Sequence, residues 1–210
     1  MSLDQRREQE KQERRDSILD AAEQAFFSKG FDKCSMDDIA RNAQLSRALL
    51  YVYFKDKNAI MRGIVLRSVA ALRDRFIQVA QGPGPGLQKV AALGVAYYAF
   101  SQEEPDYFDV LTQSGTFPHL LDDDEQSKAL QSCGAQVMQR MVEVLVEGVA
   151  DGSLSSARVA DPVKTAYFLR GALHGVIMEA RQPDQKATDL PDADALISYT
   201  LEMLGRSMQP

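Results

Sequence analysis

The chain has 210 residues, of which 45% are hydrophobic and 26% charged, a composition typical of a folded globular protein. No apolar run approaches the roughly 18 residues of a membrane span, and the polar N-terminus does not resemble a signal peptide, so we expect no membrane attachment. The net charge of −6 is uneven, because residues 1–62 carry +1 and the remainder −7. Only the first part of the chain therefore suits a polyanionic partner.

Cysteine usage favours the reducing cytoplasm as the location of the protein. Cys34 and Cys133 are far apart and match no metal-binding or redox spacing. A disulfide between them is the alternative.

A helical pattern of apolar residues begins at residue 16. Its members follow the i, i+3, i+4 spacing and are Ile18, Leu19, Ala22, Ala25 and Phe26. We expect Gly30 to end this helix in a left-handed conformation, with Phe31 making the hydrophobic contact that accompanies such a cap.

Two short helices are predicted next. Ser35 and Asp38 have the spacing of a capping box, and Ser46 is a second N-cap candidate only a few residues after that first helix. Helices this close leave a turn of about three residues, which is the helix-turn-helix arrangement. The turn needs a positive φ near Gln44, which costs a residue other than glycine about 1 kcal/mol.

The second short helix carries apolar side chains on two faces. At 100° per residue, Leu50, Tyr53 and Phe54 fall within about a third of the circumference and form a core stripe. Tyr51 and Val52 point the other way, so we expect them to face a partner.

The rest of the chain is predicted to be helical. Asp56 opens a long helix, which the linker GPGPG at 82–86 ends. Further helices are expected at 87–103, 105–115, 123–150, 161–181 and 192–207. No stretch alternates as a β-strand does. The predicted fold class is all-α, with a three-helix helix-turn-helix domain at 1–57 and a larger helical domain at 58–210.

Residues 17–66 resemble the DNA-binding domain of TetR-family transcriptional regulators. The resemblance lies in the A-x-x-x-F-x-x-x-G-F end of the first helix, the D-I-A of the second and the L-L-Y-x-Y-F-K-x-K of the third. It implies a homodimer that binds a roughly palindromic double-stranded DNA operator. It also implies a small effector that binds the C-terminal domain and releases the DNA.

The resemblance and the exposed helix face together suggest a set of DNA-binding residues. We expect these to be Ser35, Met36, Ser46, Arg47, Ala48, Leu49, Tyr51, Val52, Tyr53, Lys55 and Lys57. Leu49 and Val52 replace polar residues that are frequent in the family, and apolar side chains can read thymine methyl groups. The polar segment 1–15 is either a basic arm or helix extension near DNA, or a frayed segment whose charges pair with one another.

The last two predicted helices suit a dimer interface. Helix 161–181 is apolar around most of its circumference, and helix 192–207 carries an apolar stripe. We expect the homodimer to form through both helices, as the family resemblance implies. Packing within one chain is the alternative.

The middle helices are rich in aromatic residues and methionine. As a set they suit an apolar or aromatic effector in a cavity of about 300 Å³ or more, although each can be ordinary core. The expected ligand-binding residues are Tyr97, Tyr98, Phe100, Tyr107, Phe108, Phe117, Met138, Met141, Phe168, His174 and Met178.

The remaining polar groups point to no cofactor, metal ion or catalytic residue. His119 is either a ligand contact or an ordinary loop histidine. The acidic residues at 122–125 either hold a divalent ion or complement a helix macrodipole, and we favour the second. We therefore predict a DNA-binding repressor that a small effector releases. A DNA-binding protein controlled by a protein partner and an enzyme are the alternatives, and no nucleophile–base pair supports the enzyme.

Overall fold

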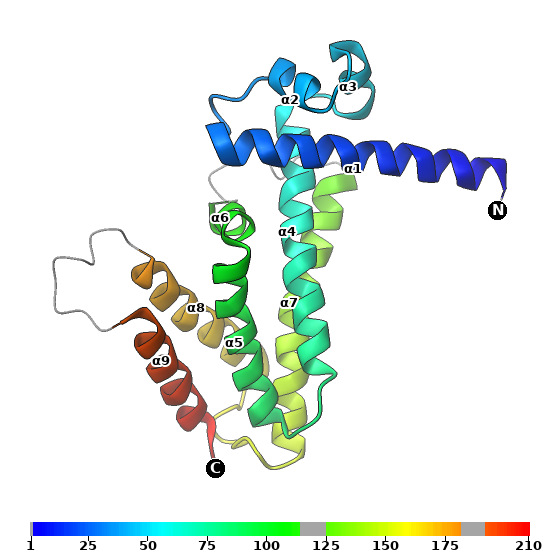
Figure 1. Ribbon diagram of the computed structural model, residues 1–210. Coiled ribbons are helices and arrows are strands. Elements are labelled where there is room, and N and C mark those ends of the chain that lie inside the picture. Colours follow the sequence, from blue (N-terminus) through cyan, green and yellow to red (C-terminus); the bar gives the residue numbers. More distant parts are fainter. Residues whose placement is uncertain (1, 114–124, 182–191) are drawn as a thin grey trace. The chain divides into compact units, whose positions relative to one another are not determined.

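The computed structural model describes residues 2–113, 125–181 and 192–210, which contain nine α-helices and no strand (Figure 1). The helices are α1 (Leu3–Lys29), α2 (Met36–Asn42), α3 (Arg47–Tyr53), α4 (Lys57–Ala80), α5 (Gly86–Glu103), α6 (Pro105–Gln113), α7 (Glu125–Ala150), α8 (Pro162–Ala180) and α9 (Ala193–Met208). The predicted all-α fold is confirmed, and the predicted caps Ser35 and Ser46 directly precede α2 and α3.

The first helix begins far earlier than its apolar pattern. Ser2 and Gln5 form a capping box, in which the Gln5 N–H donates to Ser2 Oγ and the Ser2 N–H to Gln5 Oε1. The polar segment is therefore a helix extension and not a frayed segment. Apolar periodicity could not find it, because this part of α1 has no buried face.

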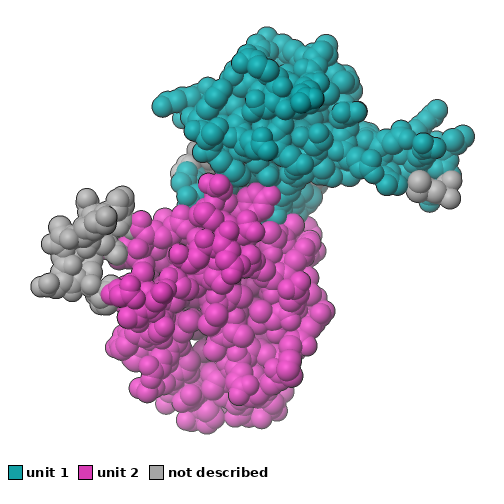
Figure 2. All heavy atoms as spheres, viewed as in Figure 1, with its two compact units in different colours: residues 1–68, 109–130 teal, residues 69–108, 131–210 magenta. Residues whose placement is uncertain are grey.

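The chain forms two compact units (Figure 2). The first unit contains residues 1–68 and 109–130, and the second contains residues 69–108 and 131–210. The packing boundary thus differs from the division predicted after residue 57. The reason is that the first part of α4 belongs to the core of the first unit, where Ile60 and Ile64 are fully buried.

Two contacts hold α4 against α1 within the first unit. At Gly63 a Cβ atom would lie 2.7 Å from Leu19 Cδ2, so a larger residue would push the helices apart. One turn further, Arg67 donates to the carboxylates of Asp16, Asp20 and Glu23 at 2.8, 2.7 and 3.1 Å. Close packing and ion pairing therefore fix the same pair of helices.

The cap after α1 differs in one respect from the prediction. The helix ends before Gly30, and Phe31 packs on Phe26 with ring centroids 5.2 Å apart, as expected. Gly30 has φ 82° and ψ 151°, which is outside the left-handed helical region. Glycine is still the residue that adopts this backbone conformation without strain.

The turn between α2 and α3 has the predicted positive φ at Gln44, of 55°. The Leu45 N–H donates to the Ala40 carbonyl oxygen at 2.9 Å, and the Gln44 N–H to that of Arg41 at 3.1 Å. This pair of hydrogen bonds is the Schellman motif, whose left-handed position glycine usually holds. The turn therefore has the usual geometry of this motif but carries glutamine at the position that glycine usually holds.

In the second unit, α5 is joined closely to α9. A Cβ atom at Gly94 would clash with the Leu201 side chain, and Tyr98 Oη donates to Asp194 Oδ1 at 2.6 Å. Figure 1 shows α8 beside α9, and the core includes Leu145 of α7 and Leu169 of α8. In the described part of the chain, no helix has both the length and the apolar character needed to cross a bilayer.

Replacing Gln44 with glycine should leave stability unchanged or raise it by up to about 1 kcal/mol, because the strain of the left-handed residue is removed. Urea unfolding measures this change. The control is Ala43→Gly, at the neighbouring position with φ −76°, which should lose about 0.5–1 kcal/mol. A clear loss of stability in Gln44→Gly would contradict the strain argument.

Candidate functional site

Helix α3 places its side chains on two distinct faces. Leu50 and Phe54 are buried, whereas Tyr51 and Val52 are 42% and 75% exposed. The predicted division into a core face and an outward face is thus confirmed. Ala48 and Leu49 are exposed on the same helix, while Tyr53 is half-buried. Contact of the outward face with DNA stays a prediction.

Arg47 and Tyr51 lie together on this outward face. The Arg47 guanidinium lies 5.6 Å from the centroid of the Tyr51 ring, one turn along the helix. It also pairs with Asp37 of α2, with Nη1 3.3 Å from Oδ2. The exposed arginine is therefore oriented by both helices of the helix-turn-helix pair.

The serine caps mainly serve the helix starts. Ser46 Oγ accepts from the Leu49 N–H at 3.2 Å. Ser35 donates to Asp38 Oδ2 from its N–H at 3.0 Å and from Oγ at 2.7 Å, which holds the pKa of the Asp38 carboxyl well below its usual range. The Ser35 N–H is thus already engaged. Met36, the next expected contact, is half-buried.

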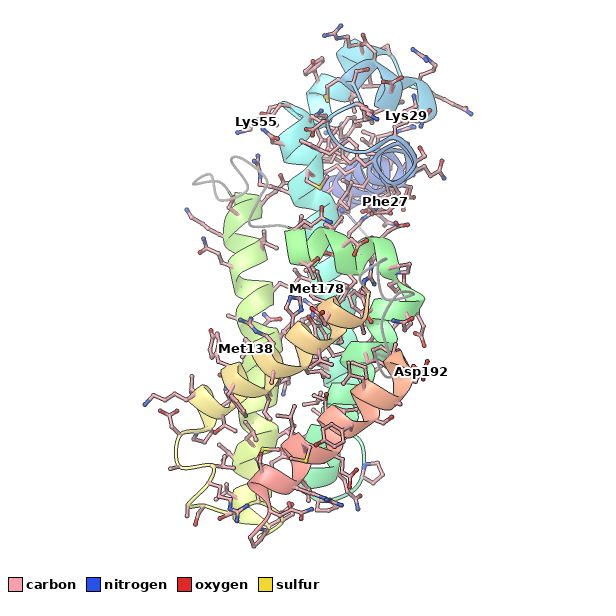
Figure 3. All side chains as sticks on the ribbon, turned by 90° about the vertical axis from the view of Figure 1, so that its left-hand side faces the viewer. Phe27, Lys29, Lys55, Met138, Met178 and Asp192 are labelled. Atoms are coloured by element: carbon pink, nitrogen blue, oxygen red, sulfur yellow. The ribbon has the colours of Figure 1, made fainter. Side chains whose placement is uncertain are left out.

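Lys57 has a role that the sequence did not indicate. Its ammonium group donates to the carbonyl oxygens of Phe31 and Cys34 at 2.7 and 3.0 Å and lies 4.3 Å from the centroid of the Phe31 ring. The predicted contact of Lys57 with DNA would have to compete with these bonds. We therefore assign Lys57 to the support of the loop between α1 and α2. Lys55, labelled in Figure 3, is exposed.

Arg15 is a residue that sequence reasoning missed. Its Nη1 donates to the Tyr53 carbonyl oxygen at 2.8 Å, and its guanidinium lies 4.4 Å from the centroid of the Phe54 ring. Arg15 therefore ties α1 to the C-terminal end of α3. The two partners are 38 residues apart, so no local spacing could have revealed the contact.

An apolar cavity of about 70 Å³ lies inside the second unit. Helices α4, α5, α7, α8 and α9 all contribute to its lining, with Leu72, Leu93, Val137, Leu173 and Leu201 among the apolar side chains. Tyr97 and Arg170 bring the polar groups. The cavity is smaller than the predicted 300 Å³. An apolar cavity of about 150 Å³ admits benzene, so even a single ring requires side chains to move.

Of the expected ligand-binding residues, Tyr97 and Met141 line this cavity. Phe100 and Phe108 are fully buried core residues that do not reach it. Tyr98, Tyr107 and Met138, the last labelled in Figure 3, are half-buried and also absent from the lining. Phe117 lies outside the described residues, as do His119 and most of the acidic segment at 122–125.

Phe168 and Met178 are corrections to the predicted ligand set. They are 60% and 39% exposed on α8, and Figure 3 labels Met178 there. The buried arc of this helix runs through Leu169, Leu173 and Ile177, and neither of the two residues lies on that arc. Periodicity showed that α8 has two apolar faces but not which face is turned inward.

A polar pair lies beside the cavity. Tyr97 Oη lies 2.9 Å from His174 Nδ1, and Phe108 packs against both rings at centroid distances of 5.6 and 6.0 Å. Burial raises the pKa of Tyr97 to about 12 and, together with the positive charge of Arg170, lowers the pKa of His174. Both groups therefore favour their neutral forms.

The outer faces of α8 and α9 carry exposed apolar side chains. On α8 these are Tyr167, Phe168 and Met178, and on α9 they are Tyr199 and Met203. Between them on α8, a Cβ atom at Gly171 or Gly175 would have no described heavy atom within 4 Å. Leu204, also on α9, lines the cavity.

Two family descriptions match the chain, and together they cover most of it. The description "Bacterial regulatory proteins, tetR family" matches residues 18–64, and "Tetracyclin repressor-like, C-terminal domain" matches residues 90–204, more than half of the chain. The chain therefore belongs to the TetR family of bacterial transcriptional regulators. These proteins bind DNA operators and small-molecule effectors, act as dimers and are not enzymes.

Individual relatives agree with this family. The chain is 27% identical to the HTH-type transcriptional repressor BepR of Brucella suis over 105 residues, 48% of this chain and about half of BepR. It is also 27% identical to the HTH-type transcriptional repressor KstR2 of Mycolicibacterium smegmatis over 140 residues, 67% of each chain.

Solved structures show the same fold. A TetR/AcrR-family regulator from Thermobifida fusca superposes with a TM-score of 0.73 at 24% identity, covering 92% of this chain and 97% of the other. FadR from Bacillus subtilis in complex with stearoyl-CoA superposes with a TM-score of 0.69 at 18% identity, covering 92% and 98%.

Two aromatic residues, Tyr51 of α3 and the C-cap residue Phe54, should respond oppositely to truncation. Phe54→Ala should cost about 3–5 kcal/mol of stability, because it leaves a cavity in a small core. Tyr51→Ala should change stability by less than about 1 kcal/mol but weaken operator binding, because it removes an exposed side chain. Urea unfolding and DNA-binding titrations separate the two effects. If Tyr51→Ala unfolds the protein and Phe54→Ala does not, the inner and outer faces have been interchanged.

Lys57→Met should lose about 1.5–3 kcal/mol of stability, since it removes charged hydrogen bonds to loop carbonyl groups. Lys33→Met, at an exposed lysine of the same loop, is the control and should stay within about 0.5 kcal/mol of the parent protein. Thermal and urea unfolding measure both. Should Lys57→Met keep its stability and instead flatten the salt dependence of DNA binding, the lysine would be a phosphate contact after all.

Proposed function

We propose that this protein is a ligand-responsive transcriptional repressor, released from its operator by a small apolar or aromatic effector. One observation carries the proposal: a single chain combines an outward recognition face on α3 with an apolar cavity inside its second unit. A DNA-binding protein controlled only by a protein partner would have no need of such a cavity. Because a bacterial repressor acts on DNA inside the cell, we place it in the cytoplasm.

Helix α4 is the element that can connect effector and DNA. It runs without interruption from Lys57 to Ala80, with its first part in the helix-turn-helix unit. Its second part brings Leu72 and Phe76 to the cavity wall. An effector that displaces these side chains biases the position of α4, and any difference in its affinity for the two positions appears as coupling to DNA binding.

The proposed dimer forms through α8 and α9. Their exposed aromatic and methionine side chains form an apolar face that a second copy can cover, and the glycines at 171 and 175 allow helices to approach closely. The two-fold axis of such a dimer presents two α3 helices to DNA, so the operator is expected to be roughly palindromic.

The cavity lining indicates the class of effector. Leucine, valine and methionine side chains dominate it, which favours a compact apolar molecule. Met141 has a flexible side chain and can make room for a ring. The similar FadR structure is a complex with stearoyl-CoA, whose acyl chain is apolar.

A small apolar effector should raise the melting temperature of the protein and weaken its binding to DNA. At 100 times its Kd a ligand adds about 2.7 kcal/mol, or roughly 5–10 °C for a chain of this size. The measurements are thermal unfolding with toluene, naphthalene and decanoate, and titration of a duplex selected from a random-sequence library by the full-length protein.

Two valines of α5 provide a matched pair of variants for the same experiment. Val90 lines the cavity, whereas Val95 is 55% exposed. Val90→Phe should fill the cavity and abolish the thermal response, and Val95→Phe should preserve it. An equal response of the two variants would place the ligand outside the cavity. A ligand that stabilises the protein but leaves operator affinity unchanged would contradict release.

A further inference from the structure

We propose that the N-terminal part of α1, residues 3–14, is a second DNA-binding element that contacts the phosphate backbone beside each half-site. We call these residues the arm. The proposal rests on the DNA-binding function proposed above and assigns the arm one occupant, double-stranded DNA. Its contacts are expected from Arg7 and Arg14, with Lys11 between them.

The arm begins where the recognition helix ends. Arg15 donates to the carbonyl oxygen of Tyr53, which is the last residue of α3. Helix α1 therefore passes the C-terminal end of α3. Beyond this contact, the arm continues for about 18 Å at 1.5 Å per residue. Figures 1 and 2 show it extending past the other helices of the first unit. A duplex that holds α3 in its major groove has a phosphate strand along each edge of that groove.

The basic residues of the arm share one narrow face. At 100° per residue, Arg7, Lys11 and Arg14 fall within an arc of about 60°. The same arc continues along α1 through Ile18, which is buried in the first unit. No carboxylate of the arm falls within that arc. The face that packs on the helix-turn-helix unit at one end is therefore a basic stripe at the other.

Ion pairing divides the arginines of the arm into two kinds. Arg6 pairs with Glu10, with Nε 3.0 Å from Oε1, and Lys11 pairs loosely with Glu8 at 3.8 Å. Neither Arg7 nor Arg14 forms an ion pair with any residue that the structure describes. Both are exposed, and they lie about 10.5 Å apart along the helix axis. Guanidinium groups bind phosphates in a bidentate manner, so an unpaired arginine stripe suits a nucleic-acid backbone.

The arm does not contribute to the folded core of the first unit. None of its residues is buried, so it adds no core. A helical segment without tertiary packing is only marginally stable in water. Phosphate groups bound to Arg7 and Arg14 would stabilise the helix in the complex with DNA. In the free protein, three side-chain hydrogen bonds between residues four positions apart support the helix.

The test compares single arginine substitutions in the full-length protein. Arg7→Gln and Arg14→Gln remove proposed contacts, while Arg6→Gln removes the same charge from a position about 110° around the helix from the centre of the stripe. Glutamine keeps helix propensity close to that of arginine. The probe is a 40-bp duplex carrying the site selected by the parent protein, and binding is titrated at several salt concentrations.

Each of Arg7→Gln and Arg14→Gln should flatten the slope of log K against log salt by about 0.9 per subunit, the value of one phosphate contact. Arg6→Gln should leave the slope close to that of the parent protein. Hydroxyl-radical footprinting should show lost protection only at the outer edges of the site for the first two variants.

Three outcomes would overturn the proposal. If Arg7→Gln and Arg14→Gln keep the parent slope and footprint while the parent protein binds its site, the arm makes no DNA contact and the proposed function stands. If Arg6→Gln flattens the slope equally, the change in salt dependence reflects the net charge of the protein and not a contact of Arg7 or Arg14 with a phosphate. If the parent protein selects no DNA site at all, the proposed function fails together with the arm.

Discussion

The attachment of α4 to α1 is the constraint on which the rest of the molecule depends. Arg67 meets three carboxylates of α1 and also donates to the Asp16 carbonyl oxygen at 3.0 Å. These partners raise the pKa of its guanidinium against the opposing effect of burial. Gly63 removes the side chain that would separate the two helices. The first part of α4 is thereby fixed as a wall of the helix-turn-helix unit, and its second part reaches the cavity.

Much of the helix-turn-helix unit could be predicted because its determinants are local. A cap and its partner are three residues apart, as in Ser35 and Asp38, and a turn of fixed length demands a positive φ at Gln44 whichever residue stands there. The inward side of α3 follows equally directly from the positions of Leu50 within the helix and of Phe54 at its C-cap. Interactions of this kind join residues that are only a few positions apart in the sequence.

Contacts between distant segments could not be predicted in the same way. Lys57 reaches carbonyl groups 23 and 26 residues before it, and Arg15 reaches one 38 residues after it. Lys57 was expected to contact DNA, and Arg15 was counted only as part of the polar segment 1–15. Carbonyl groups exist at every residue, so the sequence does not indicate which of them a long basic side chain will meet.

The cavity was the hardest feature to predict, and α8 shows why. Periodicity revealed apolar residues around most of this helix but could not divide them between inside and outside. The structure turns Leu169 and Leu173 toward the cavity and leaves Phe168 outward. The same helix therefore lines the cavity and carries the proposed dimer face. Under the proposed mechanism, an effector that moves Leu173 would act on the dimer interface through α8 as well as on α4.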